Sequence, residues 1–457
     1  MKKKICAALM ALTMTLSLLP LPGLAAEDPS YTVDGITYVF DVDPEAGTAE
    51  LTDVIAEGEE EVSVTVPETV EYQETTYTIT TAYFSMWGTD RENIAQIALP
   101  DTVVDITGSF SKFPNLTEIT IPGSVTVFNA SFQNMENLAS ITFEEGVEEI
   151  GQSAGSMVSN CTALTAIHLP DSMKLISANS AFSDAPALTT INLPDGLTFA
   201  SNTLGHFSGD TSLTEITLPA SMTEIPQGMF SDCTSLTAVN ASSPITKVGP
   251  SAFSGATNLT TIPDLGQVTE IGSYAFNECE ALTGPVDLSN VTEIGGHAFY
   301  ECNSLPGPID LGSVTKVGSY AFYACYSLTG ELDLSNLTEI PDSAFRFAGY
   351  WREGISLTLG PNLTSIGPTA FPYVPITELV LPESLTEIGN YAFDNCTRLT
   401  GRVEIPDSVT SIGKNSFSGT AIETLTIGSG IEEIGENAFA IESLASVTIH
   451  SSEDAID

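Results

Sequence analysis

The sequence predicts a solenoid, a fold in which short coils of one chain stack on each other in a single long domain. The first observation is a phrase, V-T-x-I-x-x-x-A-F, whose phenylalanine recurs every 23 residues between Phe253 and Phe345. The second is that equivalent positions continue in both directions at intervals of 22 to 27 residues. A period of this length is typical of solenoids. The pattern predicts about 15 to 16 coils, because it has sixteen positions: Phe84, Phe110, Phe132, Gly155, Phe182, Phe207, Phe230, Phe253, Phe276, Phe299, Phe322, Phe345, Phe371, Phe393, Phe417 and Phe439.

Within each repeat the pattern predicts two short parallel strands, which are joined by tight turns or a single helical turn. In the repeat 213–233 the letters L-x-x-I-x-L predict the first strand, and Pro219 ends it because proline cannot donate a backbone hydrogen bond. Met222 and Ile225 predict a second extended segment. The phenylalanine that follows is expected to point inward, so that stacking of the coils makes one continuous core.

The start of the chain is typical of a secretory signal peptide, which we assign to residues 1–26. Three lysines precede an apolar run, and small residues stand before the expected cleavage site. The apolar run at 5–19 is shorter than the roughly 20 residues that a membrane span needs. We therefore expect a secreted, extracellular protein, with association to a cell surface as an open alternative, and no membrane insertion of the mature chain.

Residues 27–76 do not follow the repeat and are expected to form a small N-terminal β cap. Residues 31–40 and 49–54 alternate like the strands of a hairpin, with a turn-rich segment between them. Such a cap shields the first coil, whose apolar face otherwise meets water. The leucine-rich solenoid then takes up residues 77–457.

The chain is strongly acidic, with 59 acidic and 13 basic residues and a formal net charge of −46. Without the three lysines of the signal peptide, ten basic residues remain and the net charge is −49. A field of this sign repels nucleic-acid phosphates and anionic membranes, so neither is expected as a partner. The charge also keeps a long exposed protein soluble, and we expect a monomer.

Six cysteines lie outside the signal peptide, and their spacing argues against a disulfide framework. Five of them stand three residues after the repeat phenylalanine, and Cys161 is interpreted as the same position displaced by an insertion. A step of 23 residues is not the spacing of zinc ligands. We therefore expect no metal and six structural thiols within the coils: Cys161, Cys233, Cys279, Cys302, Cys325 and Cys396.

The full repeat reads P-x-S-V-T-x-I-G-x-x-A-F-x-x-C-x-x-L-T-x-I-x-L, with clear copies at 382–399, 406–417 and 268–282. This phrase resembles the BspA-type leucine-rich repeats of bacterial surface proteins, over about residues 77–449. The resemblance implies a leucine-rich repeat solenoid at the cell surface. In some members of that family it implies adhesion to host matrix or blood proteins. It transfers no binding residue, because the residues of the motif are all structural.

No group of residues predicts catalysis. The letters G-x-S-x-G at 151–155 match the nucleophile elbow of hydrolases, but here they occupy the I-G-x-x-A-F part of a repeat instead of a strand-to-helix turn. The four histidines form no H-E-x-x-H pair, and no phosphate-binding loop is present. We expect that the chain is not an enzyme and that it holds no cofactor.

Three aspartates form the first candidate binding row. Asp287, Asp310 and Asp333 share the outward position of three successive first strands, so stacking places them about 5 Å apart. Such a row could bind a cation, calcium above all, or a basic segment of a partner. The alternative is a row of carboxylates that water solvates, since each adjacent pair costs only about 1 kcal/mol in solvent.

The second candidate row is aromatic and lies in the turn before the repeat phenylalanine, at Tyr274, His297 and Tyr320. The 26-residue interval that follows Phe345 adds Tyr350, Trp351 and Arg352. Tyrosine, tryptophan and arginine are the usual anchors of protein interfaces. We therefore expect a recognition patch within residues 274–352, with packing of a longer turn as the alternative.

These observations predict a binding or adhesion protein that recognises an extracellular protein. A carbohydrate-binding or scaffolding module is the alternative, because acidic and aromatic strips also suit a glycan ligand.

Overall fold

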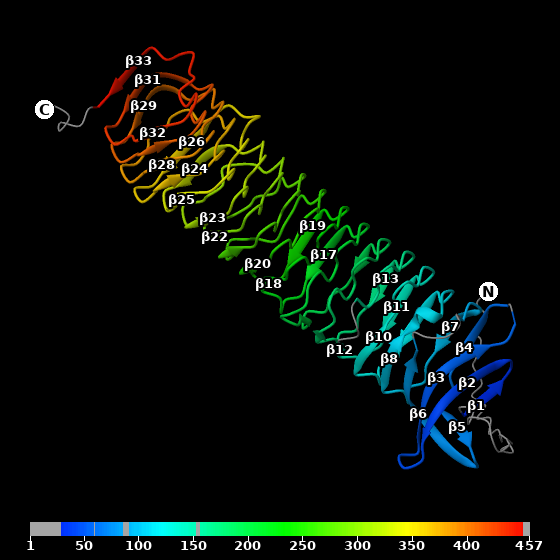
Figure 1. Cartoon of the computed structure of the whole chain (residues 1–457). Helices are drawn as coiled ribbons and strands as arrows, with labels where there is room; N and C mark the ends of the chain where they lie inside the picture. Colours follow the sequence, from blue (N-terminus) through cyan, green and yellow to red (C-terminus); the bar gives the residue numbers. More distant parts are fainter. Residues whose placement is uncertain (1–28, 59, 86–90, 152–155, 451–457) are drawn as a thin grey trace.

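The structure is a computed structural model that describes residues 29–58, 60–85, 91–151 and 156–450. Its coils stack into one elongated solenoid, with the N-terminal strands at one end and the last strand, β33 (Ser446–Ile449), at the other (Figure 1). Within the described residues the one helical element is a single 3-10 turn, η1 (Phe110–Lys112). The predicted fold class, a leucine-rich repeat solenoid of stacked parallel strands, is confirmed.

A first ladder of parallel strands comes from the L-x-x-I-x-L part of each repeat. It is divided into four sheets, in which every strand pairs with the strand one coil away. The sheets contain β4 (Val62–Thr65), β7 (Ile94–Ala98), β9 (Glu118–Ile121), β11 (Ser140–Phe143), β13 (Ala166–His168) and β15 (Thr190–Ile191); β17 (Glu215–Leu218) and β19 (Ala238–Ala241); β24 (Gly330–Leu334) and β26 (Ile355–Leu359); and β29 (Thr400–Ile405), β31 (Ala421–Ile427) and β33.

A second ladder comes from the V-T-x-I part of each repeat, where most strands are only two residues long. Its pairs keep an unshifted register, so that Ile271 lies beside Ile294 and Ile294 beside Val317. The strands are β8 (Asp105–Ser109), β10 (Val127–Ser131), β12 (Glu149–Ile150), β14 (Leu175–Ile176) and β16 (Thr198–Phe199); β18 (Glu224–Ile225), β20 (Lys247–Val248), β21 (Glu270–Ile271), β22 (Glu293–Ile294) and β23 (Lys316–Val317); and β25 (Glu339–Ile340), β27 (Ser365–Ile366), β28 (Glu387–Ile388), β30 (Ser411–Ile412) and β32 (Glu433–Ile434).

The N-terminal strands continue into these ladders. They are β1 (Ser30–Val33), β2 (Ile36–Asp43), β3 (Thr48–Ala56), β5 (Thr69–Tyr72) and β6 (Thr75–Phe84). The predicted hairpin is confirmed, since β2 and β3 are antiparallel neighbours. β3 then pairs in parallel with β6, and β6 with β8, so hydrogen bonds join the segments on both sides of residue 76. The domain boundary at that residue stays a prediction, as does the signal peptide, which lies outside the described residues.

The core is a column of stacked phenylalanine rings. Twelve rings from Phe182 to Phe439 follow one another with centroid separations between 5.1 and 5.6 Å. Phe84, Phe110 and Phe132 form a shorter column of the same kind. Burial of one such side chain contributes about 1.5–3 kcal/mol to the free energy of unfolding. The repeat phenylalanines therefore hold neighbouring coils together.

One position of the predicted column needs correction. The sequence pattern assigned it to Gly155, which lies outside the described residues. The backbone N–H of Phe132 donates to the carbonyl of Met157, in the same way as Phe207 donates to Met229 immediately before Phe230. Val158 therefore occupies the position, and it is fully buried. Cys161 then stands three residues after it, as in the other repeats, because the insertion precedes this position instead of following it.

Candidate functional site

Ten ring side chains gather on the outside of the solenoid between residues 274 and 373, and we call them the aromatic surface. Tyr274 stacks on His297 with centroids 4.6 Å apart, and His297 stacks on Tyr320 at 4.8 Å. The predicted row of three rings is thus brought together by the 23-residue register. The full set is Tyr274, His297, Tyr300, Tyr320, Tyr323, Tyr326, Phe347, Tyr350, Trp351 and Tyr373.

A second row runs beside the first. Tyr300 stacks on Tyr323 at 4.8 Å, Tyr323 meets Phe347 edge to face at 5.8 Å, and Phe347 stacks on Tyr373 at 4.9 Å. His297 lies 5.4 Å from Tyr300, which joins the two rows. Tyr373 was missed by the sequence analysis, although its place two residues after Phe371 matches that of Phe347 two residues after Phe345.

The long interval after Phe345 adds a third group. Trp351 stacks on Tyr326 with centroids 4.5 Å apart, and Tyr350 contacts Phe347 and Tyr373. Trp351 is 62% exposed and Tyr350 is 53% exposed. Large apolar side chains left in solvent as one contiguous patch mark interaction sites more often than scattered single residues do.

The backbone beneath the aromatic surface makes these rings costly. Tyr274, His297 and Tyr320 have φ between 57° and 60°, and Phe347 and Tyr373 have φ of 63°. A left-handed residue with a side chain costs about 1–2 kcal/mol, which glycine avoids. Another coil has Gly228 at the position of Tyr274. Further coils have Ser251, Tyr391 or Asn415 there with the same left-handed φ, so the turn accepts many residue types and does not by itself select a ring.

Arginines border the aromatic surface in two different ways. The guanidinium of Arg346 lies 5.0 Å from the ring centre of Phe347 and 5.9 Å from that of Tyr323. Arg352, which the sequence predicted as a site residue, instead donates from Nε to the carbonyl of Ser327 at 3.3 Å. Arg352 thus ties one coil to the previous one, whereas Arg346 covers ring faces by a cation–π contact.

Partial burial shifts the pKa values of Tyr300 and His297 in the aromatic surface. Partial burial, together with a hydrogen bond to the Glu301 carboxylate, raises the pKa of Tyr300 to about 12. Partial burial also lowers the pKa of His297 from its ordinary value of 6.5. The hydroxyl of Tyr320 donates to Asp342 Oδ2 at 3.4 Å. Residues 274–352 contain ten acidic and three basic side chains, so the rings lie in a negative field.

The predicted aspartate row has a local structural role. Asp287 Oδ1 accepts a hydrogen bond from the backbone N–H of Ser289, Asp310 from Gly312 and Asp333 from Ser335. Each is an Asx-turn, in which the side chain bonds the backbone two residues later. The hydrogen bonds from Ser289 lower the pKa of Asp287.

The aspartate row gains no support as a metal site. Within the described ranges, no three His, Cys, Asp or Glu side chains are grouped so as to hold a metal ion. The row also differs from the aromatic surface in its place in the coil: the aspartates end the first-strand segment, and the rings lie on the segment that returns to it. Asp287 and Asp310 are outside any strand, because Pro285 and Pro308 remove donors from the first ladder.

The six cysteines are free and buried. Each thiol donates to the backbone carbonyl of the repeat phenylalanine one coil earlier, with sulfur–oxygen distances between 2.9 and 3.2 Å. For Cys161 this phenylalanine is Phe132. Burial raises the pKa of the thiols, to about 11 in Cys161. Since the thiolate is the reactive form, these groups are chemically inert in the folded chain.

One coil places a carboxyl group where six other coils place a thiol, which the sequence analysis did not recognise. Asp210 stands three residues after Phe207 and is fully buried. Its Oδ1 accepts from the backbone N–H of Ala185 at 2.9 Å, and its Oδ2 has no partner. Burial raises the pKa of Asp210 well above its ordinary value. In the same coil, burial lowers the pKa of His206 to about 4.

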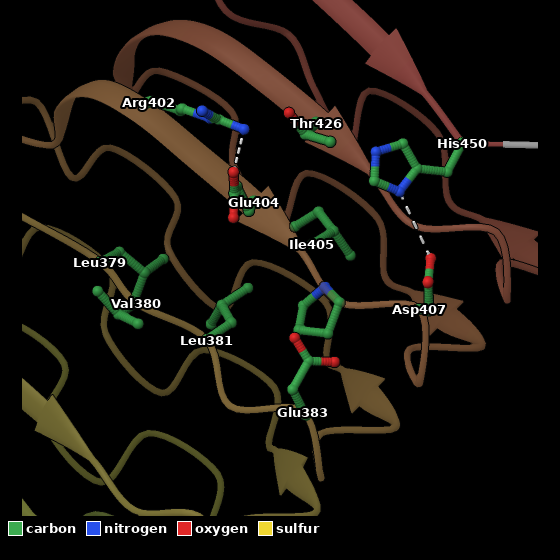
Figure 2. A pocket seen from close by; sticks show the side chains of 11 residues that line it. Leu379, Val380, Leu381, Glu383, Arg402, Glu404, Ile405, Asp407, Thr426 and His450 are labelled. Atoms are coloured by element: carbon green, nitrogen blue, oxygen red, sulfur yellow. Dashed lines mark ion pairs between the residues drawn. The ribbon is translucent and has the colours of Figure 1, made fainter.

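A hollow of about 340 Å³ near the C-terminal end is also new relative to the sequence analysis. Figure 2 shows its charged rim, where Arg402 pairs with Glu404, and His450 Nδ1 lies 3.7 Å from Asp407 Oδ1. Within each pair the two side chains engage each other, so the surface that is left for a ligand is an apolar wall. That wall contains Leu379, Val380, Leu381, Ile405 and Pro406.

Comparison with known proteins supports the same architecture. The family profile described as "BspA type Leucine rich repeat region (6 copies)" matches residues 65–159, 155–283, 269–371 and 364–457. No curated protein matches the chain. No helix in the part of the chain that the structure describes has the length and apolar character needed to cross a membrane.

Two solved structures illustrate the likeness. A leucine-rich repeat protein from Bacteroides ovatus is 22% identical, with a TM-score of 0.66, and the match covers 92% of this chain and 99% of that one. A leucine-rich cell surface protein from Faecalibacterium prausnitzii is also 22% identical, with a TM-score of 0.38 and coverage of 94% and 97%. At this identity the first likeness concerns the fold.

Proposed function

The chain belongs to the BspA-type leucine-rich repeat family, and on this premise we propose that it is a secreted or cell-surface binding protein without catalytic activity. We propose further that the aromatic surface is its recognition site and that an extracellular protein is its partner. Extended repeat solenoids bind through surfaces that several coils build together, and here five coils contribute rings to one patch.

The single observation that carries the proposal is the contiguity of the ten rings on the outside of five coils, with Trp351 62% and Tyr350 53% exposed. Five of the ten rings stand on turn positions with φ between 57° and 63°, a backbone conformation that the same turns adopt in coils without these rings, such as at Ser251 and Asn415. The turn fixes where the rings lie, and the repeat places them side by side. Exposed tyrosine and tryptophan are also the residue types that supply most binding energy in protein interfaces.

The carbohydrate alternative is less favoured by the same geometry. Rings that stack on each other at 4.6 to 4.9 Å cover their faces and present their edges. A ligand that binds by stacking on a flat ring therefore finds little free face along the two rows.

A matched pair of variants tests the proposal. Tyr350→Ala with Trp351→Ala removes the two most exposed rings of the aromatic surface. Val104→Ala with Leu204→Ala removes two exposed apolar side chains elsewhere, which are 53% and 43% exposed. Both are compared with the unaltered chain for capture by immobilised matrix proteins and by a glycan array.

The proposal expects that the affinity of the first variant for the captured protein falls by about 30-fold or more, since even one hot-spot ring contributes about 2 kcal/mol or more. The second variant should keep its affinity, and both should unfold at the temperature of the unaltered chain. Unchanged capture by the first variant, or capture by glycans alone, contradicts it.

A further inference from the structure

Trp351 combines the largest exposed fraction in the aromatic surface with a single ring contact, a feature that it shares with Tyr274. Among the described residues its one ring contact is with Tyr326, at 4.5 Å and an interplanar angle of 24°. A stack of this kind covers one face, and the side chain is still 62% exposed. His297, in contrast, has Tyr274 on one side and Tyr320 on the other. Trp351 therefore offers an open indole face to solvent.

The chain itself shows what the faces of neighbouring rings take. The Arg346 guanidinium lies over Phe347 at 5.0 Å and over Tyr323 at 5.9 Å. Both distances fall within the range of a cation–π contact, and tryptophan gives the strongest contact of this type among the aromatic residues. Arg346 thus lies over the faces of Tyr323 and Phe347 in the way that a cation of the partner would lie over the face of Trp351.

Among the described residues, the cation–π contacts involve Arg346 with Tyr323 and Phe347, and none involves Trp351. Its sequence neighbour Arg352 directs Nε to the carbonyl of Ser327 at 3.3 Å. The charge around the position is negative, with Glu353 two residues after Trp351 and ten acidic side chains between residues 274 and 352. With a formal net charge of −46, the whole molecule draws cations toward its surface and repels anions.

We infer that the open face of Trp351 receives a cationic side chain, an arginine guanidinium above all, from a basic segment of the protein partner. This inference rests on the proposed function and adds the chemistry of the partner to it. The guanidinium lies over the indole face opposite Tyr326. Neighbouring carboxylates supply the long-range attraction.

The test uses two labelled peptides and variants that conserve charge. The first peptide alternates glycine with arginine, and the second replaces every arginine with citrulline, which has nearly the same shape and no charge. Trp351→Leu keeps an apolar side chain and leaves the net charge of the protein unchanged, and Trp351→Phe keeps a weaker aromatic face. Fluorescence anisotropy measures the affinity of each pair, and thermal unfolding checks that the variants are folded.

The arginine peptide should bind about fivefold to tenfold more weakly to Trp351→Leu than to the unaltered chain, with Trp351→Phe between them. The citrulline peptide should bind poorly to all three proteins. Equal affinities for the arginine peptide in the unaltered chain and Trp351→Leu overturn the inference. So does a failure of the arginine peptide to bind the unaltered chain, or equal binding of the citrulline peptide.

The outcome separates this inference from the proposed function. If the Tyr350→Ala and Trp351→Ala protein loses capture of a matrix protein while Trp351→Leu leaves the arginine peptide unaffected, the aromatic surface binds protein through contacts other than a cation. If both measurements show no effect, the aromatic surface is not the recognition site.

Discussion

At the scale of single residues, the position three after the repeat phenylalanine controls how one coil bonds to the coil before it. Cys302 donates from its thiol to the Phe276 carbonyl at 3.0 Å, whereas Asp210 accepts at Oδ1 from the Ala185 N–H. Asp210 Oδ2 has no partner among the described residues, and a buried carboxyl group that keeps its proton carries no charge into the interior. An ionised one leaves a buried charge without a partner, which is costly in an apolar interior.

This difference predicts a pH-dependent gain from Asp210→Cys. The folded pKa of Asp210 is raised above its unfolded value of 3.8. Its contribution to stability is therefore fully present below pH 3.8 and is lost as the pH rises through the folded pKa. We expect Asp210→Cys to be more resistant to urea than the unaltered chain at pH 8, by about 1–3 kcal/mol, and to gain less at pH 4.

Urea unfolding of both proteins at the two pH values measures this gain. The stability measured at acid pH also depends on His206, whose folded pKa is lowered from 6.5 to about 4. The contribution of this histidine to stability is therefore present above pH 6.5 and is lost as the pH falls through about 4. His206 is present in both proteins, and its effect cancels in the comparison. The same gain at pH 4 and at pH 8 would show that packing, and not ionisation, distinguishes the two side chains.

The sequence could predict part of this residue-scale detail. Tyr274, His297 and Tyr320 were expected in one row because a fixed period puts equivalent positions side by side, and the rings do stack. The Asx-turns of Asp287, Asp310 and Asp333 were not foreseen, since the outward position alone does not say whether a carboxylate faces solvent or its own backbone. The isolated carboxyl of Asp210 escaped notice because one aspartate among many gives no periodic signal.

At the scale of elements, each coil is held by a column of rings inside and by short ladders at its corners. In the second ladder the Thr315 hydroxyl donates to the carbonyl of Thr292, and Thr292 donates to Thr269, both at 3.1 Å. The charged side chains of this ladder are exposed. One ion pair joins Lys247 Nζ to Glu270 Oε2 at 2.7 Å. Exposed pairs contribute only about 0–1 kcal/mol, so the ring column dominates the stability of the coil.

Phe299→Ala should therefore lower the stability of the fold far more than Tyr300→Ala, although the two residues are adjacent. Phe299 is fully buried between Phe276 and Phe322, at 5.1 Å from each, and its truncation leaves a cavity. We expect Phe299→Ala to lower the free energy of unfolding by about 3–5 kcal/mol. Tyr300 lies on the outside and should lose less than half as much.

Hydrogen exchange of the amides in coils 276–322 measures this local loss of stability, and Tyr300→Ala is the control for any effect of removing a ring. Equal losses for the two variants contradict the inward column as the source of stability.

The element-scale prediction was most accurate where the repeat was regular. The two strands and the inward phenylalanine follow from residue spacing alone. The first ladder breaks at Pro285 and Pro308, because proline cannot donate, and these breaks were readable from the sequence. The coil with Val158 was assigned to Gly155, because an insertion of a few residues before the position leaves the local letters G-x-x-x-G in apparent register.

At the scale of the whole molecule, unshifted stacking makes one surface from segments that are far apart in the chain. Rings from Tyr274 to Tyr373 span 100 residues of sequence, yet each contacts a neighbour from an adjacent coil or its own. Sequence periodicity predicted this arrangement. The left-handed turns and the open face of Trp351 could not be predicted, since they depend on backbone dihedral angles and on the neighbour of each ring.

The most direct test of the aromatic surface as a recognition site is a hydrogen-exchange footprint of the complex with a matrix protein that the unaltered chain captures. The account predicts slower exchange in separate short segments around residues 274, 297–300, 320–326 and 346–352 and near residue 373, spaced by the repeat, with no change in the coils before residue 250. Protection of one continuous stretch of sequence, or protection confined to coils outside 274–373, contradicts it.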